Sequence, residues 1–271
     1  MCSNNVGMAD NAHYAADNAD HGAGHDAGDA AEQEEREEQE ELPLTPEVLV
    51  SAYVQGIFPM DVDGQIEWFS PDPRAVIPLK AFHASKTLLQ TVRQGRFEIR
   101  INTAFEAVMQ GCAADRPKRS CVIDRPKAES ESGGLGGGTI VGGEGEFEGT
   151  ENTEAEGTWI SQAIIDAYVR LHELGLAHSV ESWAHGQLVG GLYGVALGGA
   201  FFGESMFSRQ RDASKVALVA LVERLRSRGF VLLDVQFWTA HLARFGAVEI
   251  PRANYLRQLN TALRIKTSFV D

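Results

Sequence analysis

Two apolar segments, residues 201–208 and 231–237, constrain the fold of this chain more than any other feature of its sequence. Both resemble buried strands, and the residues between them follow a helical pattern that ends at a glycine. Yet the first segment contains Glu204, and the second contains Asp234 and Gln236 on one face of the strand. A buried carboxylate without a partner is costly. The sequence therefore predicts that a strand–helix–strand unit brings these three polar side chains within reach of one another for a chemical purpose.

Charge divides the 271 residues into a body and two acidic segments. Residues 1–41 contain twelve acidic residues and one basic residue, and residues 128–157 contain eight acidic residues and no basic one. These segments carry net charges of −11 and −8, whereas the whole chain carries −14. The remaining residues therefore carry +5, which makes the body mildly basic. Residues 1–41 have too little apolar surface to offset chain entropy, so we expect a disordered acidic tail. Residues 117–157, rich in glycine and glutamate, predict a long flexible insertion.

The sequence lacks the motifs of several other protein classes. The three cysteines form no Cys-x-x-Cys pair, and no cluster of metal ligands or phosphate-binding glycine loop is found, so we expect no metal and no cofactor. The amino terminus lacks a basic start followed by an apolar run, so we expect no secretory signal. The longest apolar run, residues 188–203, is shorter than a membrane span. These features predict a soluble protein of the cytoplasm without a membrane segment.

Periodicity predicts helices and strands in a mixed order. Helical patterns occupy residues 45–56, 103–112, 158–175, 213–228 and 252–264, and further strand patterns occupy residues 97–101, 178–183, 188–195 and 248–250. Residues 56–60 are expected to form a turn-like apolar knot, and prolines are expected to keep residues 67–74 irregular. This order predicts an α+β fold, a mixed sheet flanked by helices of the acyltransferase type.

The two polar segments carry motifs that resemble those of a known family. The motifs Gly203-Glu204-Ser205-Met206-Phe207-Ser208 and Asp234-Val235-Gln236 are similar to motifs of the leucyl/phenylalanyl-tRNA–protein transferases. Further matches are Gly56-Ile57-Phe58-Pro59, Trp68-Phe69-Ser70-Pro71-Asp72-Pro73-Arg74, Thr158-Trp159-Ile160 and Leu188-Val189-Gly190-Gly191-Leu192-Tyr193-Gly194-Val195. Each motif is weak alone, but in this order they are specific, and they span nearly all of residues 45–259 outside the insertion.

The resemblance implies a fold, an activity and partners. The fold is a GNAT-like acyltransferase domain, residues 74–271, which the insertion interrupts, with a small N-terminal domain, residues 42–73. The activity is transfer of leucine, phenylalanine or, less readily, methionine from aminoacyl-tRNA to the α-amino group of an N-terminal arginine or lysine. The partners are Leu-tRNA, Phe-tRNA and acceptor proteins, whose new N-terminus directs them to N-degron degradation. We expect a monomer that needs no cofactor, because the aminoacyl ester is already activated.

The resemblance also implies roles for the three polar residues. Aminolysis of an ester needs an uncharged amine, a group that takes its proton, and a stabilised oxyanion. Gln236 would lie at the attacking amine, Asp234 would orient or polarise that amine, and Glu204 would face the cationic end of the acceptor. Two carboxylates would also favour a basic acceptor side chain. Whether Asp234 and Gln236 form a base relay or only position the amine stays open, as do purely structural roles for Asp234 and Glu204.

Four apolar residues are candidates for an aminoacyl pocket of leucine or phenylalanine size. They are Met206, Leu218, Leu221 and Leu233, with Gly203 beside them. Such a pocket would reject β-branched side chains by shape, at a cost of about 1–3 kcal/mol. Each of the four apolar residues could equally belong to the ordinary core.

Aromatic residues are candidates for contacts with the tRNA. Trp159 and Tyr168 match family aromatics near the terminal adenosine, where stacking on a base contributes about 1–3 kcal/mol. Met60 stands where the family has a tryptophan and would stack less well. Lesser candidates are Tyr53, Trp68 and Arg74. The densest basic stretch, residues 116–127, borders the insertion and is interpreted as a generic charged loop.

Two other functions are compatible with parts of the sequence. A CoA-dependent N-acetyltransferase of the same fold would need a glycine-containing turn to hold a pyrophosphate, and residues 208–214 contain no glycine. A tRNA-binding module without enzymatic activity would not need three polar groups on buried strands. The sequence therefore supports both functions less than it supports the aminoacyltransferase hypothesis.

Overall fold

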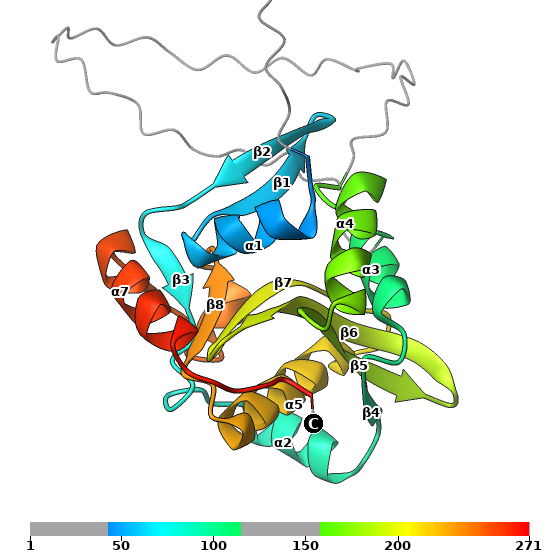
Figure 1. Ribbon diagram of the computed structural model, residues 1–271. Helices are drawn as coiled ribbons and strands as arrows, with labels where there is room; N and C mark the ends of the chain where they lie inside the picture. Colours follow the sequence, from blue (N-terminus) through cyan, green and yellow to red (C-terminus); the bar gives the residue numbers. More distant parts are fainter. Residues whose placement is uncertain (1–42, 115–157, 271) are drawn as a thin grey trace, which may run out of the picture. The chain divides into compact units, whose positions relative to one another are not determined.

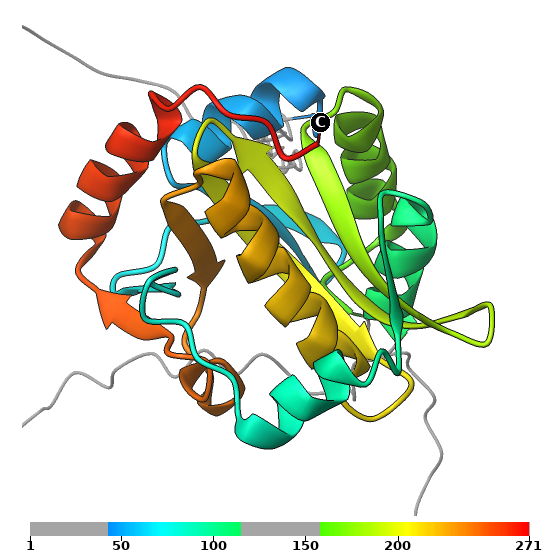
Figure 2. The same ribbon diagram turned by 90° about the horizontal axis from the view of Figure 1, so that it is seen from below.

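The computed structural model describes residues 43–114 and 158–270. The predicted acidic tail, residues 1–41, and the predicted insertion, residues 117–157, lie outside the described residues. In the described part, helices cover both faces of a seven-stranded mixed sheet (Figures 1 and 2). The predicted α+β architecture, a mixed sheet flanked by helices, is confirmed.

The large sheet has the strand order β4-β5-β6-β7-β8-β3-β9. In this order the strands are β4 (Glu98–Ile101), β5 (Ala177–Ala184), β6 (Gln187–Leu197), β7 (Ala200–Ser208), β8 (Leu232–Gln236), β3 (Arg74–Val76) and β9 (Val248–Ile250). Neighbouring strands are antiparallel except β7 and β8, which are parallel because the helix α5 (Ala213–Arg228) connects them. This is the strand–helix–strand unit that the sequence predicts.

The helices divide between the two faces of the sheet. On the α5 face lie α5 and α2 (Lys86–Arg93), side by side in Figure 2. On the other face, the α1 face, lie α1 (Pro46–Val54), α3 (Phe105–Ala114), α4 (Gln162–Glu173) and α7 (Arg252–Leu263) (Figure 1). Each face has its own apolar cluster: Phe201 and Leu233 join the cluster of α5, whereas Phe202 and Leu232 join that of α1. Alternation along β7 and β8 produces this division.

Two helix boundaries follow from local signals. Thr45 caps α1, because its hydroxyl accepts a hydrogen bond from the backbone N–H of Val48, and Pro46 occupies the first turn. Gly229 ends α5 in the left-handed conformation with φ of 80°.

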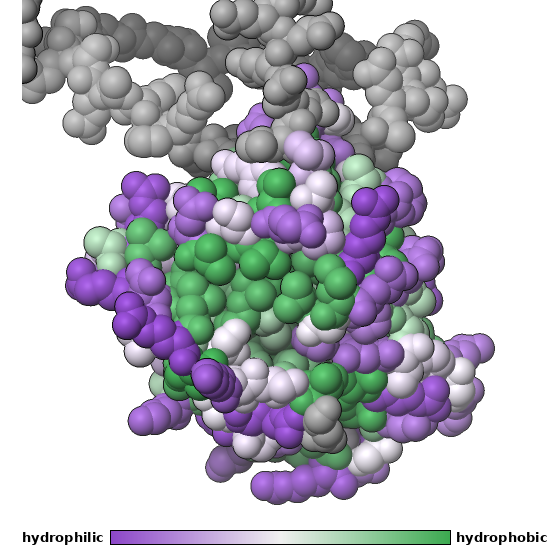
Figure 3. Space-filling model, viewed as in Figure 1, coloured by the Kyte–Doolittle hydropathy of each residue, from purple (hydrophilic) through white to green (hydrophobic). Residues whose placement is uncertain are grey.

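Hydrophobic residues also reach the surface of the molecule. Figure 3 shows them gathered in one area between α1, α4 and α7.

The structure corrects three local predictions. The expected knot at residues 56–60 contains β1 (Phe58–Val62), and the expected irregular stretch from residue 67 begins with β2 (Gln65–Phe69). These strands form an antiparallel hairpin, in which a proline is tolerated because each strand has a free edge. Trp159 and Ile160 precede α4 instead of lying on it. The sequence analysis also missed helix α2. Ser85 caps the N-terminus of this helix, because its hydroxyl accepts a hydrogen bond from the N–H of Leu88.

Candidate active site

The strands β7 and β8 separate in the middle of the sheet. Their pairing ends where Phe202 lies opposite Asp234, whereas β7 continues to Ser208. Gly203 is the first residue of β7 beyond the pairing. A β-carbon at Gly203 would find only the carbonyl oxygen of Asp234, at 3.5 Å, and Cδ1 of Leu233, at 4.0 Å. The divergence therefore leaves space between the two strands.

A β-bulge in β7 begins at the same point. Ser205 lies opposite Tyr193 of β6, and Gly203 lies opposite Gly194, so Glu204 is an extra residue without a partner in the ladder. Bulges bend a strand locally and redirect side chains, often beside functional sites. Here alternation places Glu204 on the α1 face with Phe202, and the bulge then turns the strand so that Met206 lies on the α5 face.

Glu204 receives hydrogen bonds from two elements that are distant in sequence. The hydroxyl of Tyr53 on α1 donates to Oε1 of Glu204 over 2.7 Å, and Nε2 of Gln236 donates to the same oxygen over 3.3 Å. The hydroxyls of Tyr53 and Tyr168, on α4, are also hydrogen-bonded to each other. Since Tyr53 donates to Glu204, it accepts from Tyr168. The structure thus brings Glu204 and Gln236 together under a pair of buried tyrosines.

The surroundings of Glu204 favour its neutral form. Burial raises the pKa of the Glu204 carboxyl to about 8. The hydrogen bond from Tyr53 and the charge of Arg74 oppose this rise, whereas the charge of Asp234 adds to it. A carboxyl with a pKa near neutrality is suited to exchanging a proton with an amine.

Asp234 has a different environment, a fully buried ion pair with Arg74. The guanidinium donates from Nη2 to Oδ2 of Asp234 over 2.7 Å and from Nε to Oδ1 over 3.0 Å. The hydroxyl of Tyr255 on α7 donates to Oδ2 over 2.7 Å, and the backbone N–H of Gln236 donates to Oδ1 over 2.9 Å. Asp234 therefore has no exposed oxygen for substrate and acts on the site through Gln236.

Gln236 ends β8 in a tight turn. Its φ is 58°, a left-handed conformation that glutamine rarely adopts, and the N–H of Phe237 donates to the carbonyl of Val235 over 2.7 Å. Such three-residue turns with positive φ are strained. Residues held in strained conformations cluster at functional sites. The turn sets the position of the Gln236 amide beside Glu204.

The aminoacyl-pocket candidates lie on the α5 face. Leu218, Leu221 and Leu233 are buried in the cluster of α5, and Met206 packs against it. Glu204 and Gln236 instead meet on the α1 face, so the sheet lies between the two groups. Gly203 is the residue of β7 next to Glu204, and a β-carbon there would lie 4.0 Å from Cδ1 of Leu233, which belongs to the cluster of α5.

The aromatic candidates occupy two places. Trp159 is half-buried, and its carbonyl accepts a hydrogen bond from the N–H of Asp61 over 3.2 Å, which places it beside β1 and its residue Met60. Tyr168 is fully buried, so its ring offers no face for a base. The stacking expected of Tyr168 is therefore corrected: the residue contributes its hydroxyl to the network around Glu204.

Sequence reasoning missed one residue of the site and misplaced two others. Tyr255 was not a candidate, and no local signal distinguishes it from the other residues of its helix. Tyr53 and Arg74 were lesser candidates for tRNA contact, whereas the structure joins them to Glu204 and Asp234. The family resemblance, which also includes Ala52-Tyr53 and the motif that ends at Arg74, was the only available signal.

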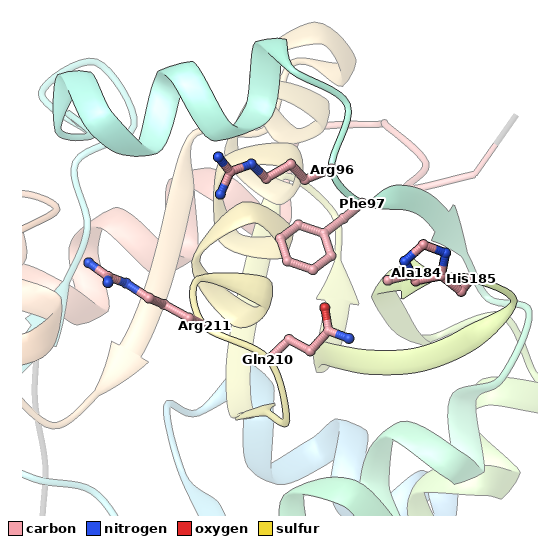
Figure 4. Close-up of a pocket in the computed structure, with 6 residues that line it drawn as sticks. All are labelled: Arg96, Phe97, Ala184, His185, Gln210 and Arg211. Carbon is pink, nitrogen blue, oxygen red and sulfur yellow. The ribbon is translucent and has the colours of Figure 1, made fainter.

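Two clefts lie apart from these residues, at the turn between β5 and β6. One, with a volume of about 480 Å³, is shown in Figure 4 and is lined by Arg96, Phe97, Ala184, His185, Gln210 and Arg211. The second is lined by Trp183, Arg209 and neighbouring residues. Neither contains Glu204, Asp234 or Gln236. Among the described residues, no group of three or more histidine, cysteine or acidic residues could hold a metal, and no helix could cross a membrane.

Comparison with known proteins identifies the family. The sequence model of the leucyl/phenylalanyl-tRNA protein transferases matches residues 76–123 and 147–260, and that of their N-terminal domain matches residues 43–72. The chain belongs to this family. It is therefore an enzyme of the tRNA-dependent transferases, as the resemblance implied.

Individual members of the leucyl/phenylalanyl-tRNA–protein transferase family are similar over nearly their whole length. The member from Herpetosiphon aurantiacus is 50% identical over 83% of this chain and 98% of its own, and that from Gloeobacter violaceus is 50% identical over 83% and 97%. The member from Rubrobacter xylanophilus is 48% identical over 83% and 98%. A solved structure, L-PGS from Bacillus licheniformis, has a TM-score of 0.32 at 11% identity over 73% of this chain and 55% of its own, too weak to carry an argument.

Proposed function

We propose that this enzyme transfers leucine, phenylalanine and, less readily, methionine from aminoacyl-tRNA to the α-amino group of an N-terminal arginine or lysine. Membership of the family supports the reaction class. The observation that carries the proposal is the pairing of Gln236 with Glu204 where β7 and β8 diverge. A primary amide and a carboxyl with a raised pKa meet there at a gap between strands.

In the proposed mechanism, Gln236 holds the attacking amine. Its Nε2 donates to Glu204, so its carbonyl oxygen Oε1 is left to accept an N–H of the acceptor amine. The amine attacks the ester carbonyl carbon and loses a proton to Glu204. The ester C–O bond then breaks, the new amide bond remains, and Glu204 returns the proton to the departing ribose oxygen of the tRNA. Tyr53 and Tyr168 stabilise the ionised form of Glu204 before it accepts that proton. Asp234 positions Gln236 through the backbone and does not touch substrate.

The aminoacyl side chain would enter the space at Gly203 and point toward the α5 face. Met206, Leu218 and Leu233 would then provide its apolar surroundings, with Leu221 behind them, which is compatible with their burial in the cluster of α5. The terminal adenosine of the tRNA would lie near Trp159 and Met60. This path would place the ester between the adenosine and the pair formed by Gln236 and Glu204.

The remaining proposals concern the setting of the reaction. The fold is proposed to be GNAT-like, with a catalytic domain at residues 74–271 and a small N-terminal domain at residues 42–73. We propose a monomer that acts in the cytoplasm, where aminoacyl-tRNA is made. Its product would be a protein whose new N-terminus directs it to N-degron degradation.

The proposal is tested by incubating the full chain with radiolabelled Leu-tRNA or Phe-tRNA and a peptide that begins with arginine. Transfer to arginine and lysine peptides, and none to an acetylated peptide, is expected. Gln236→Ala should lower kcat/KM at least about a hundredfold if the amide positions the amine. Gln187→Ala, at an exposed glutamine of β6, is the matched control and should retain activity. Acetyl-CoA turnover without aminoacyl transfer would instead favour an N-acetyltransferase.

A further inference from the structure

The structure raises the question of what recognises the basic side chain of the acceptor, and the inference below rests on the proposed function. The sequence suggested that two carboxylates attract it. Asp234, however, is fully buried, and its charge is compensated by Arg74. Glu204 already accepts hydrogen bonds from Tyr53 and Gln236, and burial favours its neutral form. Neither carboxylate is available as a fixed anion for a second positive charge.

Other acidic residues near this end of the sheet are also unsuitable. Glu249 of β9 lies opposite Ala75, and it alternates with Ile250, which packs against the cluster on the α1 face. The side chain of Glu249 therefore points to the α5 face. Asp72 accepts the backbone N–H of Arg252 over 3.0 Å at the start of α7.

Trp238 is a large aromatic residue beside the site whose exposure the fold does not explain. It follows Gln236 by two positions, and the strained turn at Gln236 leads the chain out of β8 toward it. Its exposed fraction is 47%, and it forms no hydrogen bond or ring contact with any residue in the described ranges. Phe237, 44% exposed, packs edge-on against Phe58 at 5.8 Å between ring centres. Trp238 thus presents an unused aromatic surface.

We propose that the indole of Trp238 receives the cationic side chain of the acceptor's N-terminal arginine or lysine. The face of tryptophan attracts guanidinium and ammonium groups more strongly than any other aromatic side chain does. Two extended residues span at most about 7 Å, which is comparable to the length of an arginine side chain. The Cα atoms of Gln236 and Trp238 therefore lie within about one arginine length of each other, and the proposal places the acceptor side chain along that interval. Recognition by an aromatic face also accepts both arginine and lysine, because it requires charge and no fixed hydrogen-bond geometry.

The test compares peptides that begin with arginine or with citrulline, which has nearly the same shape and no charge. With saturating Leu-tRNA, Trp238→Ala should lower kcat/KM for the arginine peptide by about threefold to thirtyfold, through KM. It should leave the citrulline peptide nearly unchanged, so that the preference for arginine shrinks. Trp238→Phe should retain part of the preference. Val231→Ala, at an exposed apolar residue just before β8, is the control and should change neither value.

Two results would overturn the inference. One is an unchanged ratio between the arginine and citrulline peptides in Trp238→Ala. The other is an equal loss for both peptides together with weaker binding of Leu-tRNA, which would assign Trp238 to a nucleobase. Failure of the proposed function would look different, because the unaltered enzyme would then transfer leucine to neither peptide.

Discussion

Arg74 and Asp234, 160 positions apart, form an ion pair in which both side chains are removed from solvent, with exposed fractions of 1% and 0%. The guanidinium also lies over the rings of Phe58 and Tyr255, at 4.8 and 4.7 Å. The pair joins β3 to β8 and holds the carboxylate that accepts the backbone N–H of Gln236. The position of the proposed catalytic amide therefore depends on a residue of β3, the strand beside β8 that comes first along the chain.

Removing either partner of this pair should destabilise the protein strongly, because an uncompensated charge stays buried. Arg74→Met and Asp234→Asn should each lower the free energy of unfolding by about 3–5 kcal/mol. The double variant should lose less than the sum, which urea unfolding measures as a double-mutant cycle. The exposed pair of Arg100 and Glu98 is the control, and its removal should change stability little. Additive losses at Arg74 and Asp234 would contradict the coupling.

The rate of transfer should depend on two ionisations if Glu204 takes the proton. Its pKa, about 8, means that the carboxyl is mostly neutral below pH 8 and becomes a base above it. The acceptor α-amine, with an ordinary pKa of about 8, must also be uncharged. The logarithm of kcat/KM should therefore rise with a slope of two below pH 7, and with a slope of one in Glu204→Gln. Identical slopes would show that Glu204 is not the base.

Tyr53→Phe should move the pH profile toward higher pH. The hydroxyl of Tyr53 donates to Glu204, which stabilises the ionised carboxylate, so its removal raises the pKa of Glu204 further. The midpoint of the rise in kcat/KM should shift upward with little change in the rate at high pH. Tyr255→Phe removes a donor to Asp234 instead and should leave this midpoint in place. A downward shift in Tyr53→Phe would refute the assignment.

Gly203→Ala should narrow the proposed aminoacyl pocket without disrupting the fold. The nearest atoms to an added β-carbon are at 3.5 Å or more, which is ordinary contact, so the free energy of unfolding should change by only about 1 kcal/mol. Transfer from Phe-tRNA should fall more than transfer from Leu-tRNA, because phenylalanine is larger. Competition between the two substrates measures this ratio. An unchanged ratio with full activity would place the aminoacyl side chain elsewhere.

Glu181 should stabilise the protein at neutral pH and lose this effect in acid. Its carboxylate accepts hydrogen bonds from the N–H groups of Thr103 and Ala104 before α3, and from Ser179 and Trp183. Burial alone would raise the pKa of Glu181, but these hydrogen bonds lower it below 4.5. A lowered folded-state pKa contributes stability above the unfolded value and loses it as pH falls through the folded value.

Glu181→Gln should therefore cost about 2 kcal/mol at pH 7, and the difference from the unaltered protein should close as the pH falls below about 4.5. Unfolding in urea at several pH values measures it. Activity per folded molecule should be unchanged, because Glu181 belongs to β5 and does not contact the residues around Glu204. A difference that stays constant down to pH 3 would contradict the lowered pKa.

The extent to which sequence predicted this protein differs between local and distant features. Helix α5 and its end at Gly229 follow from periodicity and a terminal glycine, which are properties of adjacent residues. The hairpin of β1 and β2 was missed because Pro59 lies in β1 and two further prolines, Pro71 and Pro73, follow β2, and only pairing between the two strands makes the segment regular. Trp159 shows the same limit of local patterns. The helical spacing of apolar residues begins at Trp159, although α4 begins only at Gln162.

The sequence by itself determined that Glu204, Asp234 and Gln236 would approach one another, because a strand, a helix and a parallel strand leave few other arrangements. It also determined the family, through motifs read in order. Only the tertiary structure decided that Asp234 is neutralised by Arg74 while Glu204 is held under two tyrosines. Those partners lie more than thirty positions away along the chain for Glu204 and 160 away for Asp234. Burial and charge compensation arise from such contacts, and no local pattern of residues encodes them.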